Sequence, residues 1–190
     1  ALLYTTRSFF DFVIHKLFEE TGVFEYPMAF VEKKGDYYHI VQSDALLEYE
    51  QSLFKTPNPI THLVWDSAGE GLYFTEIGQD TTSLKYIDIT SNHQYDLYSS
   101  SLINSPVISH KSHRLYFIAD FSHIPHIYQL NLNNHHLKSL SSGPLWVGQI
   151  SSVVEPSDLL VTTNRSGQPQ VYQFSSTKGG FEKQSTGGHY

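Results

Sequence analysis

The sequence has no cysteine, one methionine and two tryptophans among its 190 residues. A chain without thiols can form neither a disulfide framework nor a zinc site built on cysteine. Charged residues are also sparse, at 16%, and no apolar stretch approaches the roughly 20 residues needed to cross a bilayer. The formal net charge of −7 comes without a basic stripe, so we expect this segment to make no direct contact with nucleic acid.

Aromatic residues are abundant by contrast. Thirteen tyrosines and twelve phenylalanines supply most of an aromatic fraction of 14%. Aromatic and β-branched side chains suit the pleated, half-buried surface of a strand. The composition therefore favours an all-β fold.

Two markers recur along the chain at nearly constant spacing. The first is a leucine that opens an apolar strand: Leu72, Leu115 and Leu159, 43 and then 44 positions apart. The second is a tyrosine of the next strand: Tyr86, Tyr128 and Tyr172, 42 and then 44 positions apart. Because the tyrosines fall at one place in three units, we expect them to pack between neighbouring units.

Each repeat unit has the pattern of four short strands separated by turns. In the first unit the strands are expected at 62–65, 71–76, 83–89 and 93–98. Four strands repeating every 40 to 45 residues are typical of a β-propeller blade. One twisted four-stranded sheet cannot cover both of its faces, so such sheets pack face to face around an axis.

We therefore predict an all-β propeller segment of about four four-stranded antiparallel blades, part of a larger propeller. Blades are expected at 61–104, 105–149 and 150–190, with the chain cut at the end of the last blade. Residues 1–60 are expected to form irregular blades of the same propeller, with strands at 28–32, 37–42 and 46–51. An unclosed segment exposes sheet edges, which favours a homodimer.

Residues 9–20 fit two patterns. Phe9, Phe10, Val13, Leu17 and Phe18 can share one helical face, but the alternation and the β-branched residues of 11–17 also fit a strand. We favour the strand.

Two passages resemble TolB-type propeller repeats. Residues 164–172, NRSGQPQVY, are similar to the loop and strand "(D/N)RSG-x-PQ-(I/V)Y", and residues 65–74, WDSAGEGLYF, are similar to the "WSPDGxxLxF" strand-turn-strand. The middle unit keeps the frame but departs from both motifs. The resemblance covers about residues 61–188 and indicates the repeat class rather than one member of it.

The resemblance implies three settings. One is periplasmic TolB, which binds lipoprotein and colicin-import partners; another is the extracytoplasmic sensor of a CadC-like membrane-anchored transcriptional regulator. The third is the propeller that gates prolyl-oligopeptidase-type serine hydrolases. Because two of the three units have lost the PDG turn, we favour the CadC-like sensor, with the TolB-like scaffold next. Either setting implies a periplasmic or extracytoplasmic module that binds a protein partner or a small ligand on one propeller face.

Histidines supply the candidate site residues. The eleven histidines include three close pairs: His110 with His113, His123 with His126, and His135 with His136. Such pairs can share a metal where loops meet, or respond to acid because imidazole titrates near neutrality, but polar turns also hold ordinary surface histidines.

We expect no metal or cofactor here. The candidate partner-binding or pH-sensing surface consists of five residues: His110, His113, His123, His126 and Trp146. Trp146 follows Pro144 in a linker and is either a core residue or an exposed contact.

Catalytic motifs are missing from the sequence. It has no cysteine nucleophile, no Gly-x-Ser-x-Gly elbow and no glycine-rich phosphate loop followed by lysine. We therefore expect no catalytic residues, and a function in binding.

Overall fold

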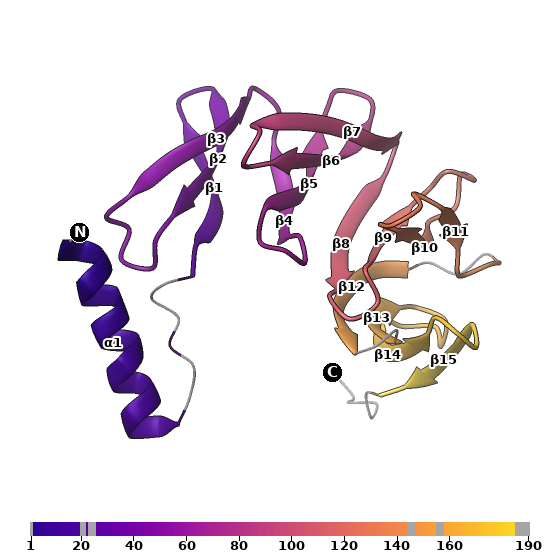
Figure 1. Ribbon diagram of the computed structural model, residues 1–190. Helices are drawn as coiled ribbons and strands as arrows, with labels where there is room; N and C mark the ends of the chain where they lie inside the picture. The colour runs from indigo at the N-terminus through magenta and orange to yellow at the C-terminus, as the bar shows by residue number, and fades with distance from the viewer. Residues whose placement is uncertain (1, 20–21, 23–25, 144–146, 155–157, 185–190) are drawn as a thin grey trace. The chain divides into compact units, whose positions relative to one another are not determined.

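The computed structural model describes residues 2–19, 22, 26–143, 147–154 and 158–184 (Figure 1). The chain divides into two compact units, Ala1–Asn58 and Pro59–Tyr190, and each is described by itself. No helix of the described residues is both long and apolar enough to span a membrane.

The first unit contains a helix and a three-stranded antiparallel sheet. The helix is α1 (Leu2–Phe18), and the sheet has the order β1 (Met28–Lys34), β2 (Tyr37–Ser43) and β3 (Glu50–Thr56). The strand that we favoured within residues 9–20 is therefore wrong. Between Phe9 and Phe18 only Val13 and Ile14 are β-branched, so helix propensity outweighs the short alternation.

The expected strands at 28–32 and 37–42 are confirmed as β1 and β2, but the strand expected at 46–51 is wrong. Residues 44–49 form a loop instead. Asp44 Oδ1 accepts the backbone N–H groups of Leu46 and Glu48, both at 3.0 Å. Leu47 adopts a left-handed backbone with φ of 56°. The aspartate thus closes a turn, and the strand begins only at Glu50. That residues 1–60 belong to the same propeller stays a prediction.

The second unit consists of three four-stranded antiparallel sheets, each with its strands in chain order. The first sheet contains β4 (Ile60–Trp65), β5 (Gly71–Ile77), β6 (Thr82–Asp88) and β7 (His93–Ser100). The second contains β8 (Ile103–Ser109), β9 (Arg114–Ala119), β10 (His126–Asn131) and β11 (Leu137–Ser139). The third contains β12 (Val147–Val154), β13 (Asp158–Thr163), β14 (Gln170–Ser175) and β15 (Gly180–Lys183).

These sheets stack as the blades of a propeller do. The first strands of the sheets contact one another, β4 with β8 and β8 with β12, while β7, β11 and β15 form the opposite edges. The predicted all-β propeller architecture is confirmed.

The alternation of β9 shows why the sheets stack. Leu115, Phe117 and Ala119 belong to an apolar cluster with side chains of the β4–β7 sheet, whereas Tyr116 and Ile118 belong to a cluster with side chains of the β12–β15 sheet. All five side chains are fully buried. Burying each large apolar side chain contributes about 2 kcal/mol, so the middle sheet is stabilised from both faces.

The three repeat tyrosines all pack between sheets, as predicted, but not from one position. Tyr128 and Tyr172 pair with the residue two places after the marker leucine, whereas Tyr86 pairs with Tyr73, one place after Leu72. Because successive side chains of a strand point to opposite faces, Tyr86 faces the following sheet and the other two face the preceding one. The single shared place that we predicted is therefore wrong for Tyr86.

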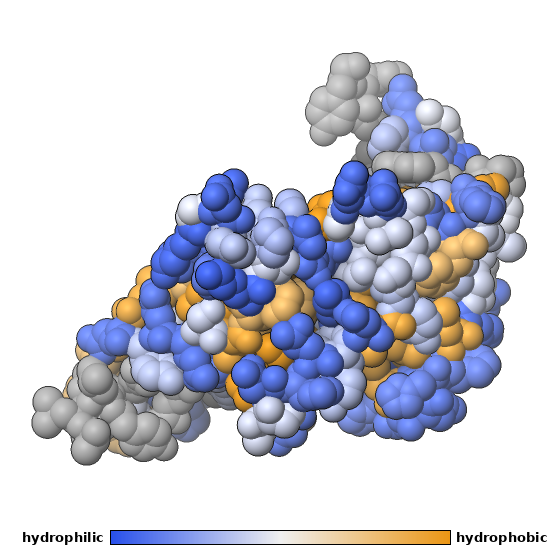
Figure 2. Space-filling model, turned by 90° about the horizontal axis from the view of Figure 1, so that it is seen from above, coloured by the Kyte–Doolittle hydropathy of each residue, from blue (hydrophilic) through white to orange (hydrophobic). Residues whose placement is uncertain are grey.

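Hydrophilic residues cover much of the face drawn in Figure 2, with apolar patches between them. Among the described residues of the second unit, the exposed large hydrophobic side chains are Ile77, Tyr95, Phe121, Ile124 and Val171. Tyr95 is the most exposed of them, at 46%.

Candidate functional site

A cleft of about 370 Å³ lies between the β4–β7 sheet and the β8–β11 sheet. Its lining residues are Tyr73, Tyr86, Asp88, Tyr95, Leu97, Leu130, Leu132 and His135. A hollow of about 250 Å³ adjoins it, because Tyr73 and Leu132 line both. The hollow is also lined by the β4–β5 turn and by His113. We call the two together the tyrosine cleft.

Three tyrosines form one wall of the tyrosine cleft. Tyr73 on β5, Tyr86 on β6 and Tyr95 on β7 are direct cross-strand partners. The ring centroids of Tyr73 and Tyr86 are 4.7 Å apart, and those of Tyr86 and Tyr95 are 6.1 Å apart. Tyr73 is buried and Tyr95 is 46% exposed, so the row leads from the interior to the surface. His93 lies edge-on against Tyr95, with centroids 4.7 Å apart.

Asp66 fixes the position of the middle tyrosine. The Tyr86 hydroxyl donates to Asp66 Oδ2 at 2.8 Å. The other oxygen, Oδ1, accepts the N–H groups of Ala68 and Glu70, both at 3.0 Å, and so closes the β4–β5 turn. Gly71 leaves the space for this approach, because a Cβ there would overlap the Tyr86 phenol.

The pKa values of Tyr73, Tyr86 and Asp88 are shifted by their surroundings in the tyrosine cleft. Burial raises the pKa of Tyr73 to about 12, and the charge of Asp66 adds to this. Burial also raises the pKa of Tyr86, together with its hydrogen bond to Asp66 and the charges of Asp66 and Asp88. The backbone N–H of Ser91, which donates to Asp88 at 2.9 Å, lowers the pKa of Asp88. The phenols are therefore neutral near pH 7, while Asp88 is ionised.

The opposite wall comes from the second sheet. Leu130 on β10 is buried in the core, whereas Leu132 and His135 lie in the connection from β10 to β11. The backbone N–H of Leu132 donates to the carbonyl of His113 at 3.1 Å, which holds this connection against the β8–β9 turn. The tyrosine cleft thus has an apolar wall, an aromatic wall and a polar rim.

The histidines predicted as one surface are divided between the two ends of the second sheet. His110 and His113 lie in the β8–β9 turn, whereas His123 and His126 lie between β9 and β10, at the other end of β9. Strand β9 separates the two pairs, so the structure does not bring the four histidines together, and their role in partner binding or pH sensing stays a prediction. His113 lines the tyrosine cleft, as does His135 of the third pair. Trp146 lies outside the described residues.

The other predicted histidines have local structural roles or are exposed. His110 is exposed, and His123 is exposed in a tight turn with φ of 66°. His126 Nδ1 lies 3.4 Å from the Ser141 hydroxyl, which also accepts the N–H of Ile127 at 2.9 Å and so satisfies the edge of β10. Within the described ranges, no three His, Cys, Asp or Glu side chains are grouped to hold a metal.

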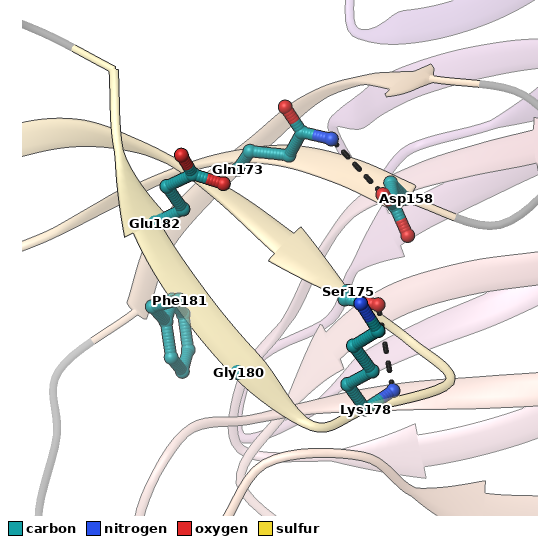
Figure 3. A pocket seen from close by; sticks show the side chains of 7 residues that line it. All are labelled: Asp158, Gln173, Ser175, Lys178, Gly180, Phe181 and Glu182. Carbon is teal, nitrogen blue, oxygen red and sulfur yellow. Dashed lines mark hydrogen bonds between the residues drawn. The ribbon is translucent and has the colours of Figure 1, made fainter.

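A third hollow, of about 250 Å³, lies on the last sheet (Figure 3). Gln173 donates to Asp158 Oδ2 at 2.9 Å across this hollow, and the N–H of Lys178 donates to Ser175 Oγ at 3.4 Å. Figure 3 shows Phe181 pointing away from Gln173 and Glu182. All the lining residues come from one sheet and its hairpin, so this hollow has no second wall. It is a weaker candidate than the tyrosine cleft.

Sequence analysis missed the aromatic wall. It identified Tyr86 as a packing residue and gave Asp66, Tyr73 and Tyr95 no part in a site. A usable signal was present, because Tyr86 and Asp88, two residues apart, share one face of their strand, as do Tyr95 and Leu97. The sequence alone does not give the register of β6 and β7, which places Tyr86 beside Tyr95.

Comparison with known proteins identifies the fold of the chain but not its activity. No protein-family model and no curated protein sequence matches the chain. TolB from Acinetobacter baumannii matches with a TM-score of 0.81 at 17% identity, over 94% of this chain and 46% of that protein. A putative TolB from Agrobacterium tumefaciens matches with a TM-score of 0.69 at 12% identity, over 83% of this chain and 60% of that protein.

A puromycin-hydrolysing peptidase from Mycobacterium tuberculosis also matches, with a TM-score of 0.64 at 13% identity, over 83% of this chain and 28% of the peptidase. The chain thus spans less than two thirds of each of these proteins. At such identities the likeness establishes the fold alone: the chain has a TolB-like β-propeller fold.

Proposed function

We propose that this propeller is a binding module without chemistry of its own, and that a segment of a protein partner occupies the tyrosine cleft. The observation that carries the proposal is the cross-strand row of Tyr73, Tyr86 and Tyr95, which leads from a buried ring to one that is 46% exposed. Tyrosine is enriched at protein interfaces, since it buries a large ring and keeps a polar group for water or a partner.

The shape of the tyrosine cleft supports a partner segment as its occupant. Productive interfaces combine an anchor in an apolar pocket with a polar rim that excludes water. Here Leu97, Leu130 and Leu132 supply the apolar surface, and Asp88 and His135 lie with them in the lining. A volume of about 370 Å³ accommodates one or two side chains of an inserted segment.

We further propose that the module is a TolB-like scaffold that works in the periplasm or another extracytoplasmic compartment. The structural neighbours include two TolB proteins, and they lend no support to the CadC-like sensor that we favoured from the sequence. The TolB-like scaffold therefore replaces the sensor as the preferred function.

The propeller of a serine hydrolase is the second candidate, since peptidases are among the structural neighbours. It predicts that the chain fits against a catalytic domain rather than a separate partner. Hydrolysis of a p-nitrophenyl ester by the purified chain, above the rate of a heat-unfolded sample, would contradict a module without chemistry.

The binding proposal is tested by a photo-cross-linking amino acid placed at Tyr95, with the same substitution at Tyr49 as control. Tyr49 is also exposed, at 58%, but belongs to the first unit. Irradiation in an extracytoplasmic extract of the source organism is expected to give a defined protein adduct at position 95 that is missing at position 49. The same adducts at both positions, or none at position 95, would contradict the proposal.

The partner identified in this way permits a quantitative test. Tyr95→Ser is expected to weaken its binding at least about tenfold, as for an interface anchor, while the midpoint of denaturation stays unchanged. An unchanged affinity would exclude the tyrosine cleft as the binding site.

A further inference from the structure

We infer that the tyrosine cleft takes a cationic side chain, an arginine or lysine of the bound segment, over the rings of Tyr86 and Tyr95 and beside Asp88. The inference rests on the proposed function and names the chemistry of the ligand at the same site. It is carried by three observations: the aromatic row, the sign of the charges around it, and the absence of the row from the equivalent places of the other two blades of this unit.

The aromatic row offers ring faces to a cation. The planes of Tyr86 and Tyr95 are inclined by 32°, and those of Tyr73 and Tyr86 by 38°, so the rings form a curved wall rather than a closed stack. A guanidinium or ammonium group within about 6 Å of such a face is attracted by the negative π surface. Neighbouring aromatic rings that share one cation form a cage of the kind that binds cationic side chains.

The charges around the row are negative. Asp66 and Asp88 belong to the lining, and neither hollow of the tyrosine cleft is lined by a lysine or an arginine. Asp66 accepts three hydrogen bonds from its own turn and from Tyr86, so it contributes mainly its field. Asp88 accepts the N–H of Ser91 at Oδ1 and also interacts with the Ser91 hydroxyl and the Thr90 N–H, but a carboxylate with about four acceptor sites can take a further donor. Asp88 is therefore the direct partner of the cation.

Three imidazoles complete the electrostatic surroundings. His135 and His113 line the tyrosine cleft, and His93 lies against Tyr95. Each would oppose a bound cation when protonated. The binding experiment is therefore run at pH 8.

The other two blades of this unit lack the row, so it is not a packing feature of the repeat. The register places Tyr116, Gln129 and Lys138 of the second sheet where the first has its three tyrosines. In the third sheet the same places hold Leu160, Gln173 and Glu182. At the equivalent of Tyr95 the second blade even carries a lysine. The cation-binding arrangement is thus particular to the β4–β7 blade.

The test uses two probes of nearly the same shape, Nα-acetyl-arginine methylamide and its neutral counterpart Nα-acetyl-citrulline methylamide. Each is titrated into the full ¹⁵N-labelled chain at pH 8 and followed by amide chemical shifts. The arginine probe is expected to give saturable shifts at Tyr86, Asp88, Tyr95 and His135, and the citrulline probe to bind at least about tenfold more weakly. Equal binding of both probes, or shifts outside the tyrosine cleft, would overturn the inference.

Two variants test the named groups. Asp88→Asn is expected to weaken binding of the arginine probe at least about fivefold. Asp80→Asn removes the same charge from an exposed turn and is expected to leave the affinity for the probe unchanged. Tyr95→Leu keeps an apolar side chain but removes the aromatic ring, and it is expected to weaken binding of the arginine probe. Because Tyr95 is partly exposed, the substitution leaves folding unaffected. Unchanged binding in either Asp88→Asn or Tyr95→Leu overturns the cation inference.

The outcomes separate the two proposals. If citrulline and arginine bind the tyrosine cleft equally, the cation inference fails and the binding proposal stands. If neither probe binds, the cation inference fails, and the cross-link at position 95 decides the binding proposal on its own.

Discussion

The hydroxyl of Tyr86 donates a 2.8 Å hydrogen bond to Oδ2 of Asp66 and so joins the third strand of its sheet to the turn between the first two. The same aspartate closes that turn through Oδ1. The position of the middle ring of the tyrosine cleft is therefore set by a turn residue twenty positions away in the sequence. Variants of this contact test how the tyrosine cleft is built.

Tyr86→Phe is expected to lower the free energy of unfolding by about 1 kcal/mol, because it removes a partly exposed hydrogen bond to a charged group. Tyr116→Phe is the matched control: the hydroxyl of Tyr116 is buried without a hydrogen-bond partner, so its removal is expected to be neutral or stabilising. Denaturant unfolding followed by tryptophan fluorescence measures both, since Trp65 and Trp146 lie in the second unit. Equal losses in the two variants would contradict the role of Asp66.

Alkaline pH is expected to destabilise the second unit through the same tyrosines. The pKa of Tyr73 is raised to about 12, and that of Tyr86 is also raised, both chiefly by burial. A phenol whose pKa is raised by folding stabilises the fold fully below the usual tyrosine value of about 10, and this contribution is lost as the pH rises through the folded value. Unfolding free energies should therefore fall between about pH 10 and 12, and less steeply in Tyr86→Phe than in the parent chain. An identical slope in the two chains would contradict this assignment.

Gly71→Ala tests the close approach of the phenol. The added Cβ would overlap the Tyr86 ring and its hydroxyl, so the variant is expected to lose about 2 kcal/mol of unfolding free energy. In a Tyr86→Ala background the same change should cost almost nothing, because the overlapping group is gone. Gly180→Ala is the control, since nothing lies within 4 Å of a Cβ built there. A Gly71→Ala cost that persists without the phenol would indicate a backbone effect.

The arrangement of the blades was predictable because it depends on features that are local in the sequence. Alternating apolar residues and turn residues mark the strands, and the marker leucines Leu72, Leu115 and Leu159 occupy matching positions in three sheets. The side of the sheet to which a given side chain points is harder to predict, because a shift of one residue in the register exchanges the two faces of the strand. Tyr86 illustrates this: its distance to Tyr128 is one position shorter than that between the leucines. This difference of one position is within the variation of the repeat length, yet it places the Tyr86 ring on the face of the strand that packs against the following sheet.

The tyrosine cleft was not predictable from one sequence, because its walls come from two blades. Asp66 and Tyr86 meet only after the β4–β5 turn folds, and His113 and His135 meet the tyrosines only after the blades stack. Helix α1 was missed for a different reason. Five of its apolar side chains are exposed, among them Phe9 at 59% and Leu17 at 69%, so their pattern does not mark a buried helical face.

His123 is expected to act through its backbone. Asp120–His123 and Asn164–Gly167 form the same turn in two blades, and in each the last N–H donates to the first carbonyl, at 2.7 and 2.8 Å. Both last residues have a left-handed backbone, with φ of 66° and 93°. His123→Gly should therefore stabilise the second unit by about 0.5 to 1 kcal/mol. His110→Gly, in a turn residue without positive φ, should not; stabilisation of both variants alike would contradict the backbone explanation.

Asp120 is expected to be the main polar tie between the first two blades of the second unit. Its carboxylate accepts the hydroxyl protons of Ser100, at the end of β7, and of Ser101, and at 2.9 Å the N–H of Leu102; the last two residues link β7 to β8. Asp120→Ala should therefore cost about 2 kcal/mol at pH 7, the range for hydrogen bonds to a charged group. Asp80→Ala, at an exposed turn, should cost far less.

Acid should abolish this contribution of Asp120. Burial raises the pKa of the carboxyl, but the hydrogen bonds from Ser100, Ser101 and Leu102 outweigh it and lower the pKa overall. A carboxyl with a lowered folded pKa stabilises the fold above the usual aspartate value of about 3.9, and loses that effect as the pH falls through the folded value. The difference in unfolding free energy between the parent chain and Asp120→Ala should therefore be constant from about pH 5 to 7 and shrink below about pH 4. A difference that stays constant down to about pH 2 would show that the side chain acts by packing rather than by accepting these hydrogen bonds as a carboxylate.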